Sequence, residues 1–510
     1  MSTAGEPRRG PRGELLAGLA LLVFYLPASL SYVLWRHVDH NEHMYAAAAA
    51  ARSELVPYRD FCWIQGPYWI DLLSTAQRLV GGEHLLLTGR LLNWSLGLVG
   101  LLLVHHLLRR AAGPWVALLL TGLLALNRHF LVPLAEGSNY MLGFAAGMAA
   151  VVLLLRALDT RRWLAGFVSG VLLGIATGAK LYHAAAWPVF VLVALRWPRE
   201  LSRRERARGL LLPGAVGLLV GLLPFGLLVL QAPGAALFGN LRYHALNQHV
   251  FDVDGITLGD NLRKVLWMAG LPETAAVLLF LLVVVVLGLI GRVPSGARGD
   301  VLLTLFALHL PLALAAAVTP RPVHSQYFLF PLPFALLLAG RVLGALPTEK
   351  LRRVGLGAGA LALVAGLVVT AWPLARGLPR WLGEAPTTPT RMEGLAVELR
   401  ELVGEREGAV ATLSPLHPLE AGLPILPELV TGPFAYRMAG LVSAEERRAW
   451  RIVAPEELPV LLARRPPAAV LIGEEGRLDL PLEVFAQAAG YERHELSDGR
   501  LVAYLRPETR

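Results

Sequence analysis

The 510-residue chain carries few charged residues and a single cysteine. Charged residues make up 17% of the sequence, whereas soluble domains contain about 25%. With only Cys62 available, an internal disulfide framework and a cysteine-based metal site are both excluded. No DNA- or RNA-binding motif accompanies the net charge of +9. Nucleic acid is therefore not an expected partner, and the basic residues need another explanation.

Long apolar runs dominate the sequence instead. Hydrophobic residues make up 55% of the chain, and runs of about 20 apolar residues, enough for a helix to cross a bilayer core, recur from Glu14 to Leu374. We therefore predict an α-helical polytopic membrane protein with about 11 transmembrane helices. The expected spans are residues 14–35, 85–108, 114–127, 137–155, 163–178, 182–195, 210–230, 274–290, 301–318, 327–343 and 354–374.

The arginines fall in alternate loops between these runs. Six of them lie between Arg196 and Arg208, and cytoplasmic loops are enriched in arginine and lysine. Arginines before the first run predict a retained signal anchor with a cytoplasmic N-terminus. The two long polar segments, 36–84 and 231–273, and the tail then lie on the outer face. We expect a multi-pass protein of the cytoplasmic (inner) membrane with a periplasmic or extracellular C-terminal domain.

The tail after the last apolar run has a different composition. A Pro/Thr linker at 386–389 precedes a predicted amphipathic helix at 392–403. Buried strands are predicted at 409–413 and 468–472, and Ser497-Asp498-Gly499 indicates a hairpin. The pattern predicts a membrane domain over residues 1–375 and a small extracytoplasmic α/β domain over 376–510.

One outer segment contains several side chains that could take part in catalysis or ligand binding. It begins His37-Val38-Asp39-His40-Asn41-Glu42-His43-Met44-Tyr45. Asp39 and Glu42 have the spacing of a capping box, which satisfies the first amides of a helix. Carboxylates at a membrane surface can also take a proton from an acceptor hydroxyl or hold a divalent cation. The two interpretations are compatible, since a capping side chain can still present an oxygen to a ligand.

Histidines and outer basic residues extend the set of candidates. His40 and His43 are candidate ligands of a divalent metal ion, although their spacing does not match the helical zinc pattern. An ionisable group near a membrane segment is costly and commonly functional, the alternative being a side chain that snorkels to the head groups. Candidates for holding an anionic phosphate are Arg59, Arg90, Lys180, Arg242, Arg321 and His324.

These features resemble the GT-C superfamily of glycosyltransferases, polytopic enzymes that take sugars from polyprenyl-phosphate carriers. Many members carry adjacent aspartate and glutamate in the first outer loop, whereas Asn41 precedes Glu42 here. The resemblance therefore implies Asp39 as the base, with Glu42 as the second choice. The matching segments are 39–45, 57–61, Gln65-Gly66-Pro67, Arg90 at the start of the second span, Gly174 to Lys180, and Arg321 to Pro333.

The resemblance implies an inverting transfer of a sugar from a polyprenyl-phosphate donor to a hydroxyl or amine, with membrane lipids as further partners. The implied substrate-binding residues are Arg59, Arg90, Lys180, Arg242, Arg321, His324, Tyr58 and Gln65. A transporter or flippase for a lipid-linked saccharide is the main alternative, and it predicts charges or broken helices at the bilayer midplane. A second alternative is an assembly protein whose helices only anchor the tail.

Overall fold

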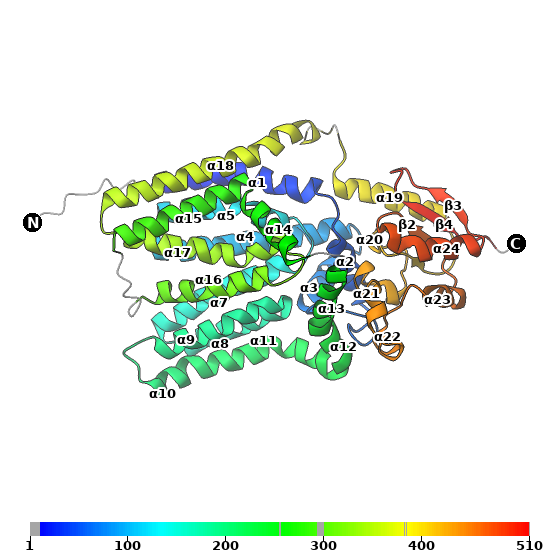
Figure 1. Ribbon diagram of the computed structural model, residues 1–510, viewed down its shortest axis with the longest axis horizontal. Helices are drawn as coiled ribbons and strands as arrows, with labels where there is room; N and C mark the ends of the chain where they lie inside the picture. Colours follow the sequence, from blue (N-terminus) through cyan, green and yellow to red (C-terminus); the bar gives the residue numbers. More distant parts are fainter. Residues whose placement is uncertain (1–10, 254–256, 293–299, 382, 384, 509–510) are drawn as a thin grey trace, which may run out of the picture.

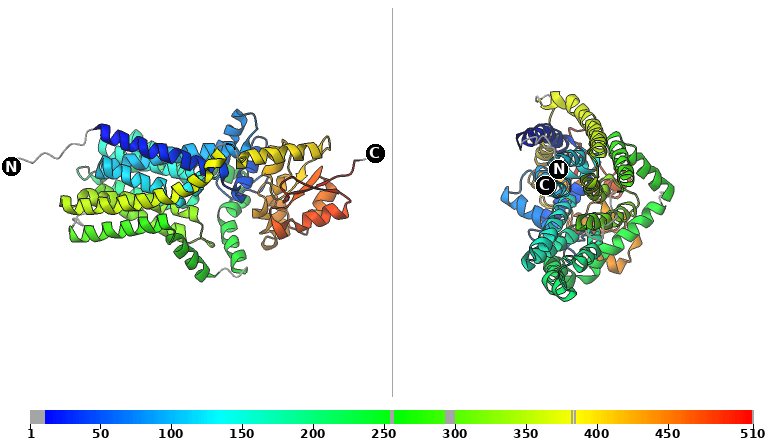
Figure 2. Two further views of the ribbon diagram at one scale, coloured as in Figure 1. Left: turned by 90° about the horizontal axis from the view of Figure 1, so that it is seen from above. Right: turned by 90° about the vertical axis from the view of Figure 1, so that its left-hand side faces the viewer.

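The computed structural model describes residues 11–253, 257–292, 300–381, 383 and 385–508. Long helices run side by side along the longest axis of the molecule, and the C-terminal domain caps one end of this bundle (Figure 1). A perpendicular view shows the same arrangement, with the two termini at opposite ends (Figure 2). The architecture is therefore a helical bundle with a mixed α/β domain at one end.

All the predicted spans are helical. Within the described residues, eight helices are long and apolar enough to cross a membrane, and there are nine if α5 and α6, bent by 63°, count as one span. α8 and the η1–α9 pair are apolar but shorter, so the count of about 11 spans stays a prediction. The bundle consists of α1 (Pro11–Trp35), α4 (Leu85–Ala112), α5 (Pro114–Ala125), α6 (Arg128–Leu134), α7 (Tyr140–Thr160), α8 (Trp163–Ala179), η1 (Leu181–Ala186), α9 (Trp187–Arg196), α10 (Arg203–Arg206), η2 (Ala207–Leu211), α11 (Leu212–Gln231), α15 (Pro272–Ile290), α16 (Val301–Val318), η4 (Ser325–Leu329), α17 (Pro331–Ala345) and α18 (Glu349–Trp381).

The two long polar segments also form helices. They contain α2 (His40–Ala51) and α3 (Tyr68–Leu79), then α12 (Pro233–Leu237), η3 (Phe238–Arg242), α13 (Tyr243–Val253) and α14 (Leu258–Ala269). α2, α3, α12 and α13 lie at the end of the bundle that carries the C-terminal domain, whereas α10 lies at the opposite end (Figure 1). Both segments and the tail therefore share one side, as the arginine pattern requires. That this side is the outer one stays a prediction.

The C-terminal domain is built on a four-stranded sheet of order β1-β2-β4-β3. β1 and β2 are parallel, and the other pairs are antiparallel. The predicted strands, the helix α19 and the hairpin at Ser497-Asp498-Gly499 are all present, and Gly499 takes a positive φ of 65° in the turn. The elements are α19 (Thr388–Val403), β1 (Val410–Ala411), α20 (Leu416–Glu420), η5 (Pro427–Leu429), α21 (Pro433–Tyr436), η6 (Ala439–Leu441), α22 (Ala444–Trp450), α23 (Leu458–Arg464), β2 (Ala469–Ile472), η7 (Gly476–Asp479), α24 (Leu480–Ala488), β3 (Glu492–Glu495) and β4 (Val502–Leu505).

An apolar cluster joins this domain to the outer helices. Met438 and Ile452 of the C-terminal domain are buried in the same cluster as Trp63 and Phe238. Trp450 of α22 stacks on Phe238, with ring centroids 4.8 Å apart. Burial of aromatic surface of this kind dominates interface energetics. The domain is therefore packed against the segments that contain the predicted site.

Candidate functional site

The site is organised by the first turn of α2. Asp39 is the N-cap, and its side chain accepts a hydrogen bond from the Asn41 amide at 2.9 Å. The Glu42 carboxylate in turn accepts from the Asp39 amide at 3.0 Å. This reciprocal pair is a capping box, so that part of the sequence prediction is confirmed. The alanines that follow favour helix, which fixes the direction in which the Asp39 carboxylate points.

Glu42 and Arg90 form a buried ion pair beneath this turn. Their side chains are 2% and 0% exposed, and the guanidinium reaches both carboxylate oxygens at 2.7 and 2.8 Å. The Gly137 amide also donates to Glu42 at 3.0 Å. Burial opposes the charge of Glu42, but Arg90 and this amide outweigh it and hold the pKa of Glu42 below its usual value.

The remaining donors of Arg90 are also used within the protein. They reach the carbonyl oxygens of Val33, Arg36 and His37 at 2.8, 3.1 and 3.2 Å. Arg90 therefore ties α4 to the end of α1 and to α2, and the expectation that it binds a substrate phosphate is wrong. Glu42, held by the same guanidinium, is fixed as an anion and is poorly placed to act as the base.

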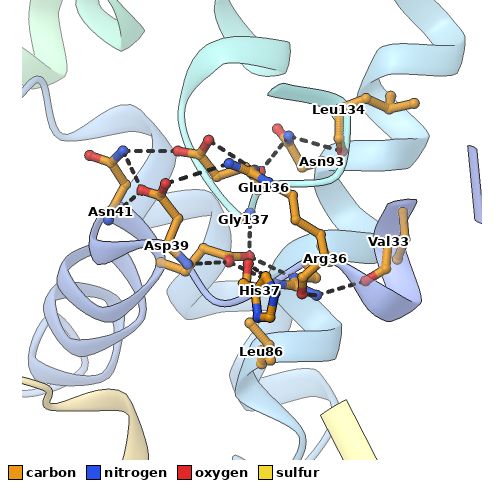
Figure 3. Close-up of polar contacts among 12 residues, drawn as sticks. Val33, Arg36, His37, Asp39, Asn41, Leu86, Asn93, Leu134, Glu136 and Gly137 are labelled. Carbon is orange, nitrogen blue, oxygen red and sulfur yellow. Dashed lines mark hydrogen bonds and ion pairs between the residues drawn. The ribbon is translucent and has the colours of Figure 1, made fainter. Parts of the chain in front are cut away.

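Asp39 is paired with a second carboxylate, that of Glu136. The Asn41 side-chain amide donates to Asp39 at 2.8 Å and to Glu136 at 3.0 Å (Figure 3). The Arg36 guanidinium lies 3.2 Å from Glu136 and 3.5 Å from Asp39. One amide and one guanidinium thus bridge the two acids. The Asp39 side chain is 29% exposed, whereas that of Glu136 is 0% exposed, so Asp39 is the acid that a substrate can reach.

Glu136 was not found by sequence reasoning. It lies between α6 and α7, where a single acid interrupts two apolar runs. An acid next to a membrane segment is commonly functional, and this was the available signal. Burial raises the pKa of Glu136 to about 8, and the nearby Asp39 adds to the rise, while Arg36 opposes it. Burial therefore favours the protonated form of Glu136.

The raised pKa of Glu136 predicts a stability that falls as the pH rises. The folded protein binds one more proton than the unfolded chain between the unfolded glutamate pKa of about 4.3 and the folded value of about 8. The free energy of unfolding therefore decreases across this window and levels off above it. We compare the melting temperature of the E136Q variant with that of wild type at each pH. We expect the difference, variant minus wild type, to be more positive at pH 8.5 than at pH 5. E83Q, at an exposed site, should show a constant difference. A constant difference for E136Q would contradict the assignment.

Two further predicted residues lie near this acid pair. Lys180 follows α8, where its extended backbone separates α8 from η1. Its Nζ lies 4.4 Å from the centre of the Tyr140 ring, and it interacts electrostatically with Glu136. His324 precedes η4 and interacts with both Asp39 and Lys180; burial, and then nearby cations, lower its pKa to about 4. The site therefore combines an exposed acid, a buried acid, an ammonium group and a neutral imidazole.

Two of the sequence motifs meet beside Lys180. A Cβ added to Gly66 would lie 1.6 Å from the carbonyl oxygen of Gly178, the residue two before Lys180. The Tyr58 hydroxyl donates to the Gln65 carbonyl at 2.5 Å, and Tyr58 is 1% exposed. The structure therefore places Tyr58 and the Gln65 backbone in the turn that supports α8. Only glycine permits this approach of backbone to backbone.

Substitution of Gly66 tests this contact. We expect G66A to push away the last turn of α8 and to cost about 3 kcal/mol of stability, as overpacking does. The matched control is G394A, since a Cβ at Gly394 would meet nothing within 4 Å. Thermal unfolding should show a clear loss for G66A and none for G394A. Equal melting temperatures for G66A and wild type would show that the turn does not pack as described.

Two of the other predicted basic residues, Arg59 and Arg242, lie elsewhere. Arg59 is 54% exposed and pairs with its neighbour Asp60 at 2.7 Å. Arg242 pairs with Glu446 of α22 at 2.5 Å and so contacts the C-terminal domain. Arg321 is half-buried in the segment before η4. The structure thus brings Lys180 and His324 to the acid pair, and it does not bring Arg59 or Arg242 there.

The predicted metal pair, His40 and His43, is separated by the helix. His40 Nδ1 lies 2.8 Å from Glu475, whereas His43 Nε2 lies 2.9 Å from Glu474. Among the described residues, the group that could hold a metal contains His43 but not His40. The prediction of a joint site is therefore wrong for His40. Both histidines face the C-terminal domain, which the sequence did not indicate.

No protein-family model matches the chain, and no curated protein matches it in sequence. Several solved structures match the chain in fold. ArnT from Cupriavidus metallidurans bound to undecaprenyl phosphate aligns over 97% of this chain and 98% of its own, with 15% identity and a TM-score of 0.61. Its apo state aligns over the same shares, with a TM-score of 0.58. The Archaeoglobus fulgidus oligosaccharyltransferase in the apo form covers 99% of this chain and 75% of its own, with 12% identity and a TM-score of 0.53.

The chain has the GT-C fold. The resemblance deduced from the sequence motifs is thus confirmed at the level of the fold. The alignment with ArnT extends over nearly the whole chain, and therefore includes the C-terminal domain as well as the helices. In this GT-C fold α2, whose N-cap is Asp39, lies at the end of the bundle that faces the C-terminal domain (Figure 1).

Proposed function

We propose that the protein is a membrane glycosyltransferase that moves a sugar from a polyprenyl-phosphate carrier to an acceptor hydroxyl or amine. The observation that carries this proposal is the pair of Asp39 and Glu136, bridged by Asn41 and Arg36 beside Lys180. The ArnT structure was solved with undecaprenyl phosphate bound, which supports a lipid phosphate as the donor's leaving group.

Asp39 is the base in this mechanism. Its carboxylate is partly exposed and is oriented by the Asn41 amide and the α2 cap. It takes the proton of the acceptor hydroxyl or amine as that atom attacks the anomeric carbon of the sugar. The bond between this carbon and the phosphate oxygen breaks in the same step. A single displacement inverts the anomeric configuration.

Glu136 and Arg36 determine the electrostatic surroundings of the Asp39 carboxylate. Because burial favours a proton on Glu136, two negative charges do not build up side by side in the pair. The partly exposed carboxylate of Asp39 is the one that meets the acceptor. Arg36 contacts both carboxylates and leaves the Asp39 side chain 29% exposed, so that substrate can reach it.

Lys180 receives the leaving phosphate in our proposal. Its ammonium group stands at the end of α8 over the Tyr140 ring, and no described carboxylate lies within ion-pair distance of it. An ammonium group without a close carboxylate partner can hold phosphate oxygens. Arg321 and His324, from the segment before η4, are proposed to flank the same phosphate.

We place this reaction at the outer face of the cytoplasmic membrane. The arginine-rich loops favour a cytoplasmic position for the opposite end of the bundle. The α/β domain beyond about residue 376 would then be extracytoplasmic and would lie over the site. The apolar helices give the polyprenyl chain a path within the bilayer, so that the phosphate alone needs to reach Lys180.

Turnover of the carrier by the purified protein tests the proposal. The protein in proteoliposomes would be given polyprenyl phosphates bearing labelled pentose, aminopentose or hexose, with an extract of envelope lipids as acceptor. We expect label in the acceptor together with free polyprenyl phosphate. Label that crosses the bilayer still attached to its carrier would instead favour the flippase alternative. Inertness with every donor would contradict a transferase.

A further inference from the structure

A cluster of histidines and acids joins α2 to the C-terminal domain. His43 of α2 and His417 of α20 both contact Glu474, which lies in the turn after β2. The Nε2 atoms of the two histidines lie 2.9 and 3.1 Å from the two carboxylate oxygens. Beside them, His40 contacts Glu475 at 2.8 Å. Three elements that are far apart in the sequence thus converge on one turn.

The geometry of three of these residues is that of a ligand set. His43, His417 and Glu474 each offer one ligand atom, and these atoms all lie within 4.8 Å of one another. Both imidazoles are buried, with side chains 3% and 5% exposed, while that of Glu474 is 32% exposed. The site is therefore closed on the protein side and reachable from solvent on the side of Glu474.

His417 provides a second, independent observation. Among the described residues, neither of its ring nitrogens has a partner with good hydrogen-bond geometry, although Nε2 lies 3.1 Å from Glu474. A buried polar atom without a partner is rare in folded proteins, and a bound ion is one of its common causes. An ion held between the Nε2 atoms and the carboxylate would give His417 Nε2 a partner.

We propose that His43, His417 and Glu474 bind a divalent transition-metal ion, for which zinc is the best chemical match. Two imidazoles and one carboxylate form a donor set typical of zinc, with metal–ligand distances of about 2.0–2.2 Å. In a tetrahedral site such ligand atoms stand about 3.3 Å apart, so the carboxylate must withdraw by a few tenths of an ångström. Glu474 lies in a partly exposed turn and can make this shift. The fourth position is left to water.

Binding of an ion to His43 Nε2 would change the protonation of the other ring nitrogen, Nδ1. The Leu416 amide lies 3.3 Å from His43 Nδ1 and donates to it, which places the proton of a neutral His43 on Nε2. Metal binding through Nε2 moves that proton to Nδ1, and the long bond from Leu416 is given up. Leu416 is the first residue of the short helix α20, where an amide has no partner within the helix.

The ion would clamp the C-terminal domain onto the helix that carries Asp39. His43 follows Glu42 directly and lies one turn beyond Asp39. The metal would therefore position α2 and take no part in the reaction itself. The proposed ligands do not include the acid pair or Lys180, so the occupancy of the metal site can be measured whether or not the proposed transfer activity is found.

Zinc content of the full-length purified protein tests this proposal. After dialysis against a chelator, the protein would be reloaded with zinc and analysed by mass spectrometry for bound metal and by thermal unfolding. We expect one zinc per chain and a melting temperature that rises with zinc. H417A and E474Q should bind at least tenfold more weakly, while H417C, which supplies a thiolate, should retain zinc. H494A is the control, since His494 lies on the outer strand β3, where its side chain is 38% exposed and 3.9 Å from Glu492.

Two results would overturn the site. One is a wild-type protein that binds no more zinc than E474Q. The other is loss of zinc in H494A to the same extent as in H417A. If H417A fails to fold, E474Q, at the partly exposed residue of the turn, gives the comparison instead. A melting temperature that zinc does not change in wild type would equally count against a metal clamp.

Discussion

Replacing Asp39 with asparagine should lower the rate of sugar transfer by about 1,000-fold, within the range expected when a general base is lost. Asparagine keeps the shape of the side chain and one oxygen for the α2 cap, which the Asn41 amide contacts at 2.9 Å. The protein should therefore fold normally and still bind the lipid carrier. Initial rates of transfer from a polyprenyl-phosphate sugar, measured in detergent, would show the loss in kcat with little change in KM.

The matched control is D71N. Asp71 lies in α3 at the same end of the bundle and is 36% exposed, paired with Arg52 at 2.6 Å. Exposed pairs of this kind contribute little to stability, so D71N should retain the wild-type rate within about twofold. If D39N transferred sugar at the wild-type rate, Asp39 would have no part in the chemistry. A loss in D71N as large as in D39N would point to a general effect of charge at this surface.

Replacing Arg90 with methionine should destabilise the protein by about 3–5 kcal/mol, because it leaves a buried carboxylate without its partner. Glu42 is 2% exposed and receives two of its close contacts from this guanidinium. The same change releases α2 from α1, so activity should fall together with stability. Chemical or thermal unfolding of the purified variant would measure the loss.

A double variant separates the ion pair from simple packing. R90M combined with E42Q removes both charges, and it should be more stable than R90M alone because no uncompensated charge remains. R263M is the control, since Arg263 is 78% exposed and pairs locally with Asp260. It should change stability by less than about 1 kcal/mol. R90M as stable as R263M would contradict the described role of Arg90.

The helices of the bundle could be predicted from the sequence because the bilayer imposes both length and polarity. In lipid, every backbone amide must be paired within its own segment, so an apolar run of sufficient length has to be helical. The bend of 63° between α5 and α6 was not predicted. It occurs at Asn127, whose side chain caps α6 by accepting from the His129 amide at 2.9 Å, a polar contact inside an otherwise uniform apolar run.

The candidate site was predicted where its contacts are local in sequence. The capping box of Asp39 and Glu42 depends on residues three apart, and it was confirmed. Arg90 was correctly singled out as a costly charge near the membrane, but the sequence cannot tell whether such a charge serves a ligand or the protein. Its partner, Glu42, belongs to a different helix. Glu136 was missed because its partners, Asn41 and Arg36, come from far along the chain.

The contacts between the C-terminal domain and α2 could not be predicted from the sequence either. The pattern of strands and the hairpin predicted its fold, since these features are local. Nothing local links His43 to Glu474 or His40 to Glu475, which meet only when the domain packs on α2. The sequence paired His43 with His40, whereas the structure places His43 beside His417 and Glu474.

The central claim is that Lys180 and Asp39 face one lipid-linked sugar phosphate. The most direct test is an electron cryo-microscopy structure of the protein with polyprenyl phosphate. The account predicts phosphate density in contact with Lys180, on the side that faces Asp39, at the end of the bundle capped by the C-terminal domain. Phosphate bound instead among the arginines near α10, at the opposite end (Figure 1), would contradict it.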